Sequence, residues 1–134
     1  MTDQHAALIH TMVLASAVDD EMTDAELRII GDIVNHLPVF ASYDHKRLTK
    51  DLGECAAFLA EEDGLEQALK RIRAALPPKL RETAYALACD VVAASGDATQ
   101  EELRLLELLQ ERLSIEPLVA AAIERGARAR FSRA

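Results

Sequence analysis

The sequence has no tryptophan, and all its aromatic residues together make up 4% of the 134 positions. Glycine and proline are also scarce, with five and four residues. Leucine, alanine, glutamate and arginine, which favour helices, dominate the remainder. No segment has the strict alternation of apolar and polar residues that is typical of a half-buried strand. The sequence therefore predicts an all-α protein.

Cysteine is nearly absent, and its two copies, Cys55 and Cys89, lie far apart inside helical patterns. They form neither a disulfide framework nor a Cys-x-x-Cys motif, which favours a reducing compartment. No apolar run approaches the roughly 20 residues that a membrane-spanning helix needs. The N-terminus also lacks the basic and apolar regions of a signal peptide. We expect a cytoplasmic protein with no membrane span.

Positive charge is in short supply. Lysine and arginine number 15 against 23 acidic residues, which gives a formal net charge of −8. Binding to nucleic acid draws on clustered basic side chains, so this balance disfavours it. The one local exception is the last stretch, with Arg125, Arg128, Arg130 and Arg133. Cations near a helix C-terminus offset the helix dipole, and that is the role we expect for them.

Motifs for catalysis are also missing. The four histidines have no metal-binding spacing, no serine, threonine or cysteine lies in a nucleophile motif, and there is no glycine-rich phosphate loop. We therefore expect a protein that is not an enzyme.

Apolar residues recur at helical spacing along the whole chain and predict a compact bundle of about seven helices. We expect Pro38 to follow the end of the second helix and Pro77 to open the fifth. Gly64 is expected to end the third helix. In the last helix, the residues expected to face the core are Leu118, Ala121 and Ala122.

The chain contains an internal repeat. A shift of 76 positions lays "AVDDEMTDAELRIIGDIVNHL" over "AASGDATQEELRLLELLQERL". The repeated halves span about 6–37 and 83–113. We expect two related helical hairpins about a pseudo-two-fold axis, with a two-helix insert between them, in a single domain over residues 1–134. Such an axis would bring the acidic turns of both halves near each other.

Each repeat contains the pattern of a capping box. In Thr23-x-x-Glu26 and Thr99-x-x-Glu102, threonine satisfies one backbone amide at the helix start and glutamate satisfies another. Gly96 lies where the preceding helix must stop, in a position suited to a positive φ angle. Helix ends alone therefore explain these residues without any ligand.

Other carboxylates near the two turns are not explained in this way, namely Asp19, Glu21, Asp90 and Asp97. Asp19 lies at a helix C-terminus, where the dipole disfavours an anion. Asp90 borders an apolar stripe, where a carboxylate needs a partner. A hard cation such as Ca²⁺ or Mg²⁺ could be the partner of these carboxylates, and so could Arg28 or Arg104. The loops lack the ligand pattern of an EF-hand.

The doubled motif, Val18–Glu26 and again Ala94–Glu102, ends one helix and caps the next in each half. In a small all-helical chain it resembles the TerB-like family, which is linked to bacterial tellurite resistance and stress response. The resemblance extends from about Ala6 to Arg130. It implies a bundle of about seven helices with no established catalytic activity. It also implies a suspected role in binding metal or a partner.

The resemblance implies metal ligands in both turns. They are Asp19 and Glu26 in the first copy, and Asp90 and Glu102 in the second. The sequence departs from the family motif at Asp20, where glycine is expected, and at Ser95, where aspartate is expected. Asp97 is the nearest replacement for that missing aspartate. The complete set of predicted metal ligands is Asp19, Glu26, Asp90, Asp97 and Glu102.

Two functional hypotheses follow. In the first, a non-enzymatic TerB-like domain binds a divalent cation of the Ca or Mg type, or a protein partner, through its paired acidic turns. In the second, the domain is a structural or protein-interaction module without metal, and its acidic residues are caps, ion-pair partners or solvated surface.

Overall fold

The structure, a computed structural model, describes residues 2–17 and 22–134, and in these segments it contains seven α-helices and no strand. The helices are α1 Gln4–Ala17, α2 Asp24–His36, α3 Leu48–Leu59, α4 Gly64–Ala75, α5 Pro78–Ala94, α6 Gln100–Arg112 and α7 Pro117–Arg130. Two short 3₁₀ turns, η1 Pro38–Phe40 and η2 His45–Arg47, join α2 to α3. The predicted all-α bundle is confirmed.

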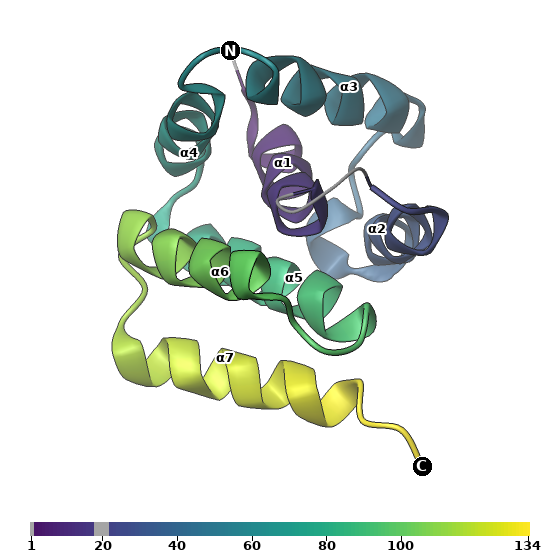
Figure 1. Ribbon diagram of the computed structural model, residues 1–134. Helices are drawn as coiled ribbons and strands as arrows, with labels where there is room; N and C mark the ends of the chain where they lie inside the picture. The colour runs from purple at the N-terminus through teal and green to yellow at the C-terminus, as the bar shows by residue number, and fades with distance from the viewer. Residues whose placement is uncertain (1, 18–21) are drawn as a thin grey trace.

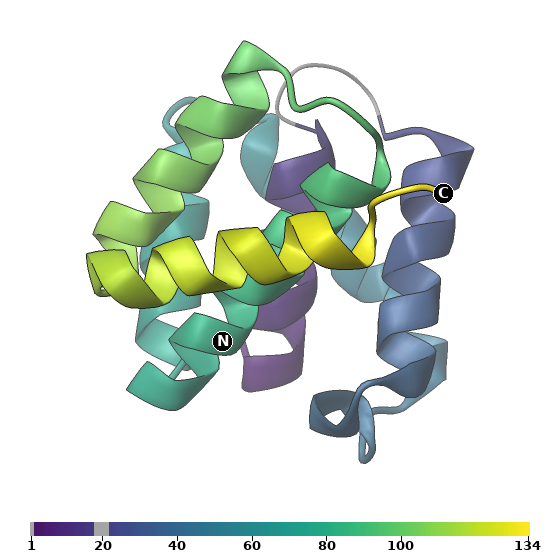
Figure 2. The same cartoon turned by 90° about the horizontal axis from the view of Figure 1, so that it is seen from below.

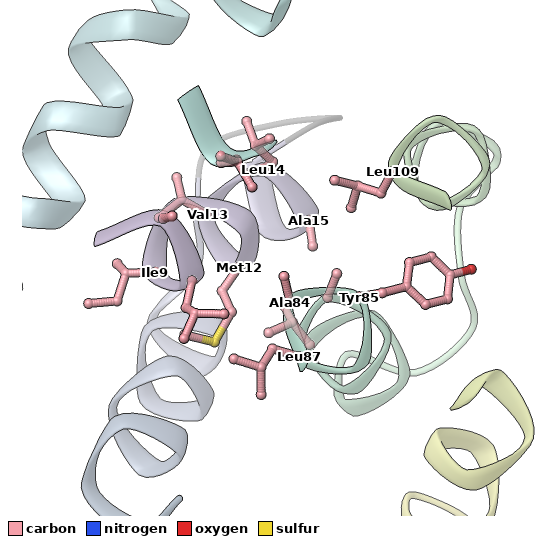
Figure 3. Packing of buried hydrophobic residues seen from close by; sticks show 14 of the residues in the cluster. Ile9, Met12, Val13, Leu14, Ala15, Ala84, Tyr85, Leu87 and Leu109 are labelled. Carbon is pink, nitrogen blue, oxygen red and sulfur yellow. The ribbon is translucent and has the colours of Figure 1, made fainter. Parts of the chain in front are cut away.

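Helix α1 lies at the centre of the bundle and is buried from Ala6 to Ser16. It packs against α5, α3, α4 and α6 (Figure 1). Figure 3 shows Met12 of α1 pointing toward Leu87 and Ala84 of α5, and all three side chains are at most 2% exposed. A helix that is apolar on every face must be surrounded in this way, which explains why the first helix of the chain forms the core.

The two repeated halves have matching helices. Helices α2 and α6 each contain 13 residues, and both their starts and their ends differ by the 76 positions of the repeat. Their contacts match as well, because α1 packs against α6 as α5 packs against α2. If a two-fold axis relates the two halves, each pair of packed helices must have an equivalent pair, and these contacts meet that requirement. Helices α3 and α4, the predicted insert, pack against α1.

Among the described residues, no helix combines the length and the apolar character needed to cross a membrane.

The prediction that Gly64 ends the third helix is wrong, because Gly64 is the first residue of α4. The left-handed residue at this turn is Asp63, with a φ angle of 59°. Gly64 is required for space, since a Cβ atom there would lie 2.1 Å from the carbonyl oxygen of Phe58. The predicted break between the two helices is present. The glycine is needed there because another part of the backbone passes close to it.

The expected inward face of α7 is also wrong. Leu118 is 76% exposed, and Ala121 and Ala122 are exposed too, whereas Ala120 and Ala127 are buried. Helix α7 lies along the outside of the bundle and packs mainly on α5 (Figure 2). Small apolar residues occur on both of its faces, so hydrophobic spacing alone does not identify the buried one.

Candidate functional site: a groove between two capped helix starts

Both predicted capping boxes are present. At the start of α2, the backbone amide of Glu26 donates to Thr23 Oγ1 at 3.1 Å, and the amide of Thr23 donates to Glu26 Oε1 at 2.9 Å. At the start of α6, Thr99 and Glu102 make the same two hydrogen bonds at the same distances. The two helix starts are therefore locally equivalent, as the sequence repeat predicts.

The turn before α6 also follows the prediction. Gly96 has a φ angle of 106°, which residues with a side chain rarely adopt. A Cβ atom at this position would meet nothing within 4 Å. Glycine is therefore required here by backbone conformation and not by crowding.

The two capped starts line one open groove of about 570 Å³, which we call the cap groove. Its lining residues come from α2, from the end of α5 with the following turn, from α6 and from the C-terminal stretch: Thr23, Ala25, Glu26, Arg28, Ile29, Ala94, Ser95, Asp97, Thr99, Glu102 and Arg133. Arg133, in the stretch that follows α7, lines the groove together with residues of α2. Helix starts that are 76 residues apart thus form a shared surface.

Three of the five predicted metal ligands line this groove, namely Glu26, Asp97 and Glu102. Glu26 and Glu102 each commit one carboxylate oxygen to a capping box. Asp19 lies outside the described residues, as does Glu21. Among the described residues, no group of three or more His, Cys, Asp or Glu side chains is arranged to hold a metal ion.

Asp90 does not line the groove. Its side chain, 17% exposed, forms an ion pair with Arg130 of α7. The need for a partner was predicted correctly, but the expected partners, Arg28 and Arg104, were wrong. Helix α7 packs on α5, which brings Arg130 next to Asp90 although the two residues are 40 positions apart in the sequence. No local sequence pattern indicates this pairing.

Charges of both signs border the cap groove without forming ion pairs in the part of the chain that the structure describes. They are Arg28, Arg133 and Asp97. Ile29 also lines the groove, with a partly buried apolar side chain. Sequence reasoning did not place Arg133 or Ile29 here, because the first is remote in the chain and the second continues an ordinary apolar stripe.

A second hollow of about 410 Å³ lies on the other side of the turn at Asp97, between α5, α6 and α7. Its lining is mainly apolar and includes Cys89, Leu103 and Glu124. Burial, together with the nearby carboxylate of Glu124, raises the pKa of the Cys89 thiol to about 12. Cys89 is a core residue and is 3% exposed. A thiol with such a pKa is not an activated nucleophile.

The capping boxes give a first prediction. Replacing Thr23 or Thr99 with alanine is expected to lower the free energy of unfolding by about 1 kcal/mol, because each removes a side-chain acceptor at a helix start. Urea unfolding followed by circular dichroism measures this. Thr49→Ala, at an exposed position inside α3, is the control and should change stability by less than about 0.5 kcal/mol. Equal losses in all three variants would contradict the assignment.

Comparison of this chain with models of protein families, with curated proteins and with solved structures finds no significant match.

Proposed function

We propose that this chain is a non-catalytic, TerB-like helical domain that binds a protein partner at the cap groove. The observation that carries the proposal is the convergence of both capped helix starts on one groove. The capping boxes explain the two glutamates that the groove contains. They do not explain Arg28, Asp97 and Arg133, which border it without ion pairs among the described residues.

A protein surface fits this arrangement better than a small substrate does. The groove is open, its charges have both signs, and its apolar contribution comes from Ile29 and small residues. Charged rims around a modest apolar centre are typical of transient protein interfaces, in which charge complementarity selects the partner. A polyanion is disfavoured because three carboxylates line the groove together with the two arginines and the chain carries a net charge of −8.

Affinity enrichment from the cells that produce the protein tests this proposal. The tagged chain is compared with Arg28→Glu/Arg133→Glu, which reverses both groove cations. The charge-matched control is Lys46→Glu/Lys70→Glu, at two exposed positions that do not line the groove. We expect at least one protein to be enriched about tenfold or more by the wild type and the control relative to the groove variant, since about 1.4 kcal/mol corresponds to tenfold in affinity. The same enriched set from all three chains would contradict the proposal.

A divalent cation is the second candidate ligand. Glu26, Asp97 and Glu102 line the same groove, but they do not form a preassembled metal-binding group, so a cation would have to draw them together. Carboxylate oxygens are the ligands that Ca²⁺ and Mg²⁺ prefer. Calorimetric titration of the metal-free chain with each ion tests this candidate, with Asp97→Asn as the variant. Binding heat that is lost in Asp97→Asn would support a cation in the groove. The absence of heat, together with an unchanged melting temperature in excess metal, would exclude it.

A further inference from the structure

Helix α7 presents an apolar and basic face to solvent. Leu118 is the most exposed of the large apolar side chains in the described part of the chain, at 76%. Ala121, Ala122 and Arg125 follow at helical spacing and are also exposed. They form a single outward stripe, because positions i, i+3, i+4 and i+7 share one face of a helix. Figure 2 shows α7 lying across the outside of the molecule.

A groove of about 390 Å³ between the start of α4 and helix α6 has the complementary character, and we call it the α4–α6 groove. Three leucines contribute its apolar part: Leu65, Leu105 and Leu108. Leu105 is 2% exposed, whereas Leu65 and Leu108 are only partly buried. The groove therefore offers a recess in which an apolar side chain from outside can displace water.

The rim of the α4–α6 groove is acidic. It carries Glu101, Glu107 and Glu111, none of which forms an ion pair with any described residue. Glu107 and Glu111 are four residues apart on one helix, where like charges repel by about 0.2–0.5 kcal/mol. Arg104 is the one lining cation among the described residues. A guanidinium group from another molecule would therefore reduce the electrostatic repulsion between these glutamates.

We propose that the α4–α6 groove of one copy of this chain docks helix α7 of a second copy. The stripe on α7 supplies what the groove lacks, a protruding leucine and an arginine that forms no ion pair with the described residues. The spacing also agrees. Leu118 and Arg125 are seven residues apart, as are Leu108 and Glu101, and seven helical residues span about 10.5 Å. With α7 antiparallel to α6, Leu118 lies over Leu108 while Arg125 lies over Glu101.

Small residues allow the two helices to approach. Ala121 and Ala122 lie between the leucine and the arginine on the α7 stripe, so α7 contributes no large side chain at the middle of the contact. The contact joins two different surfaces, which makes it heterologous. Such a contact either closes into a ring or continues as a chain of subunits, unless a two-fold arrangement pairs both contacts at once.

Sedimentation velocity of the intact chain tests the proposal, at concentrations from about 10 μM to 1 mM, the range expected for a small interface. We expect the weight-average mass to rise with concentration. The rise should be suppressed in about 1 M salt, where the Debye length falls to about 3 Å. Leu118→Ser/Arg125→Glu should be monomeric throughout, and so should Glu101→Lys/Glu107→Lys. Both pairs change exposed positions, and circular dichroism checks that the fold is retained.

Mixing the two variants is the decisive step. The first retains an intact α4–α6 groove and the second retains an intact α7 stripe, so the mixture can form one productive contact and should give a heterodimer. The matched controls are Leu27→Ser, at another exposed leucine, and Asp24→Lys/Asp32→Lys, which changes the charge equally on α2. Both should associate as the wild type does.

Three results would overturn the proposal. They are a wild-type chain that stays monomeric at every concentration, association that persists in either variant, and variants that fail to pair when mixed. If the groove variant stays monomeric but the control Asp24→Lys/Asp32→Lys also loses association, net charge and not the groove is responsible, and the proposal is likewise rejected.

Discussion

Replacing Gly64 with alanine is expected to destabilise the protein by about 3 kcal/mol or more, because the change overpacks a site bounded by backbone. The new Cβ would lie 2.1 Å from the carbonyl oxygen of Phe58 and 2.9 Å from the Cα of Leu59. Neither atom belongs to a flexible side chain, so the end of α3 and the start of α4 would have to move apart. Urea unfolding of the variant measures the loss.

Replacing a glycine in an uncrowded position is expected to change the stability in the opposite direction. Gly53 lies inside α3 at an exposed position, and a Cβ there would meet nothing within 4 Å. Gly53→Ala should raise the free energy of unfolding by about 0.5–1 kcal/mol, because alanine is the better helix former. Similar stability of the two variants would contradict the close approach assigned to Gly64.

Replacing Asp51 with alanine is expected to cost about 2–3 kcal/mol, because it removes a hydrogen bond to a charged group and leaves a buried donor unsatisfied. The Asp51 side chain is 3% exposed, and its Oδ2 accepts a hydrogen bond of 2.6 Å from the Tyr43 hydroxyl. Arg47 lies 3.4 Å from the same oxygen and also pairs with Asp3 at 2.8 Å. The cluster thus ties η2 and α3 to the residue just before α1.

Removal of Asp51 would leave the buried tyrosine hydroxyl without its acceptor. Burial, and then the hydrogen bond to Asp51, raise the pKa of Tyr43, so its hydroxyl is a protonated donor at neutral pH. Asp32→Ala, at an exposed position on α2, is the control and should change the free energy of unfolding by less than about 0.5 kcal/mol. A loss below about 1 kcal/mol in Asp51→Ala would show that the pair contributes little.

The sequence predicted the features that depend on neighbouring residues. Both capping boxes and the positive φ angle of Gly96 are present, because each is set within about four positions of the chain. The matching bounds of α2 and α6 follow from the repeat for the same reason.

Features that depend on distant contacts were missed. The pairing of Asp90 with Arg130 requires α7 to pack on α5. The role of Gly64 requires the end of α3 to pass close by. Arg133 lines the cap groove together with residues of α2, which are remote from it in the sequence. No local pattern encodes these approaches. The predicted cation ligands remain a prediction, since Asp19 lies outside the described residues.

Site-specific photo-crosslinking tests binding at the cap groove most directly. Benzoylphenylalanine replaces Ala25, an exposed residue that lines the groove, or Asn35, an exposed residue near the other end of the same helix. In the producing cells, the account predicts a discrete crosslinked species from position 25, its loss when Arg28→Glu is added, and none from position 35. The absence of crosslinks at position 25, or the same species from both positions, would contradict it.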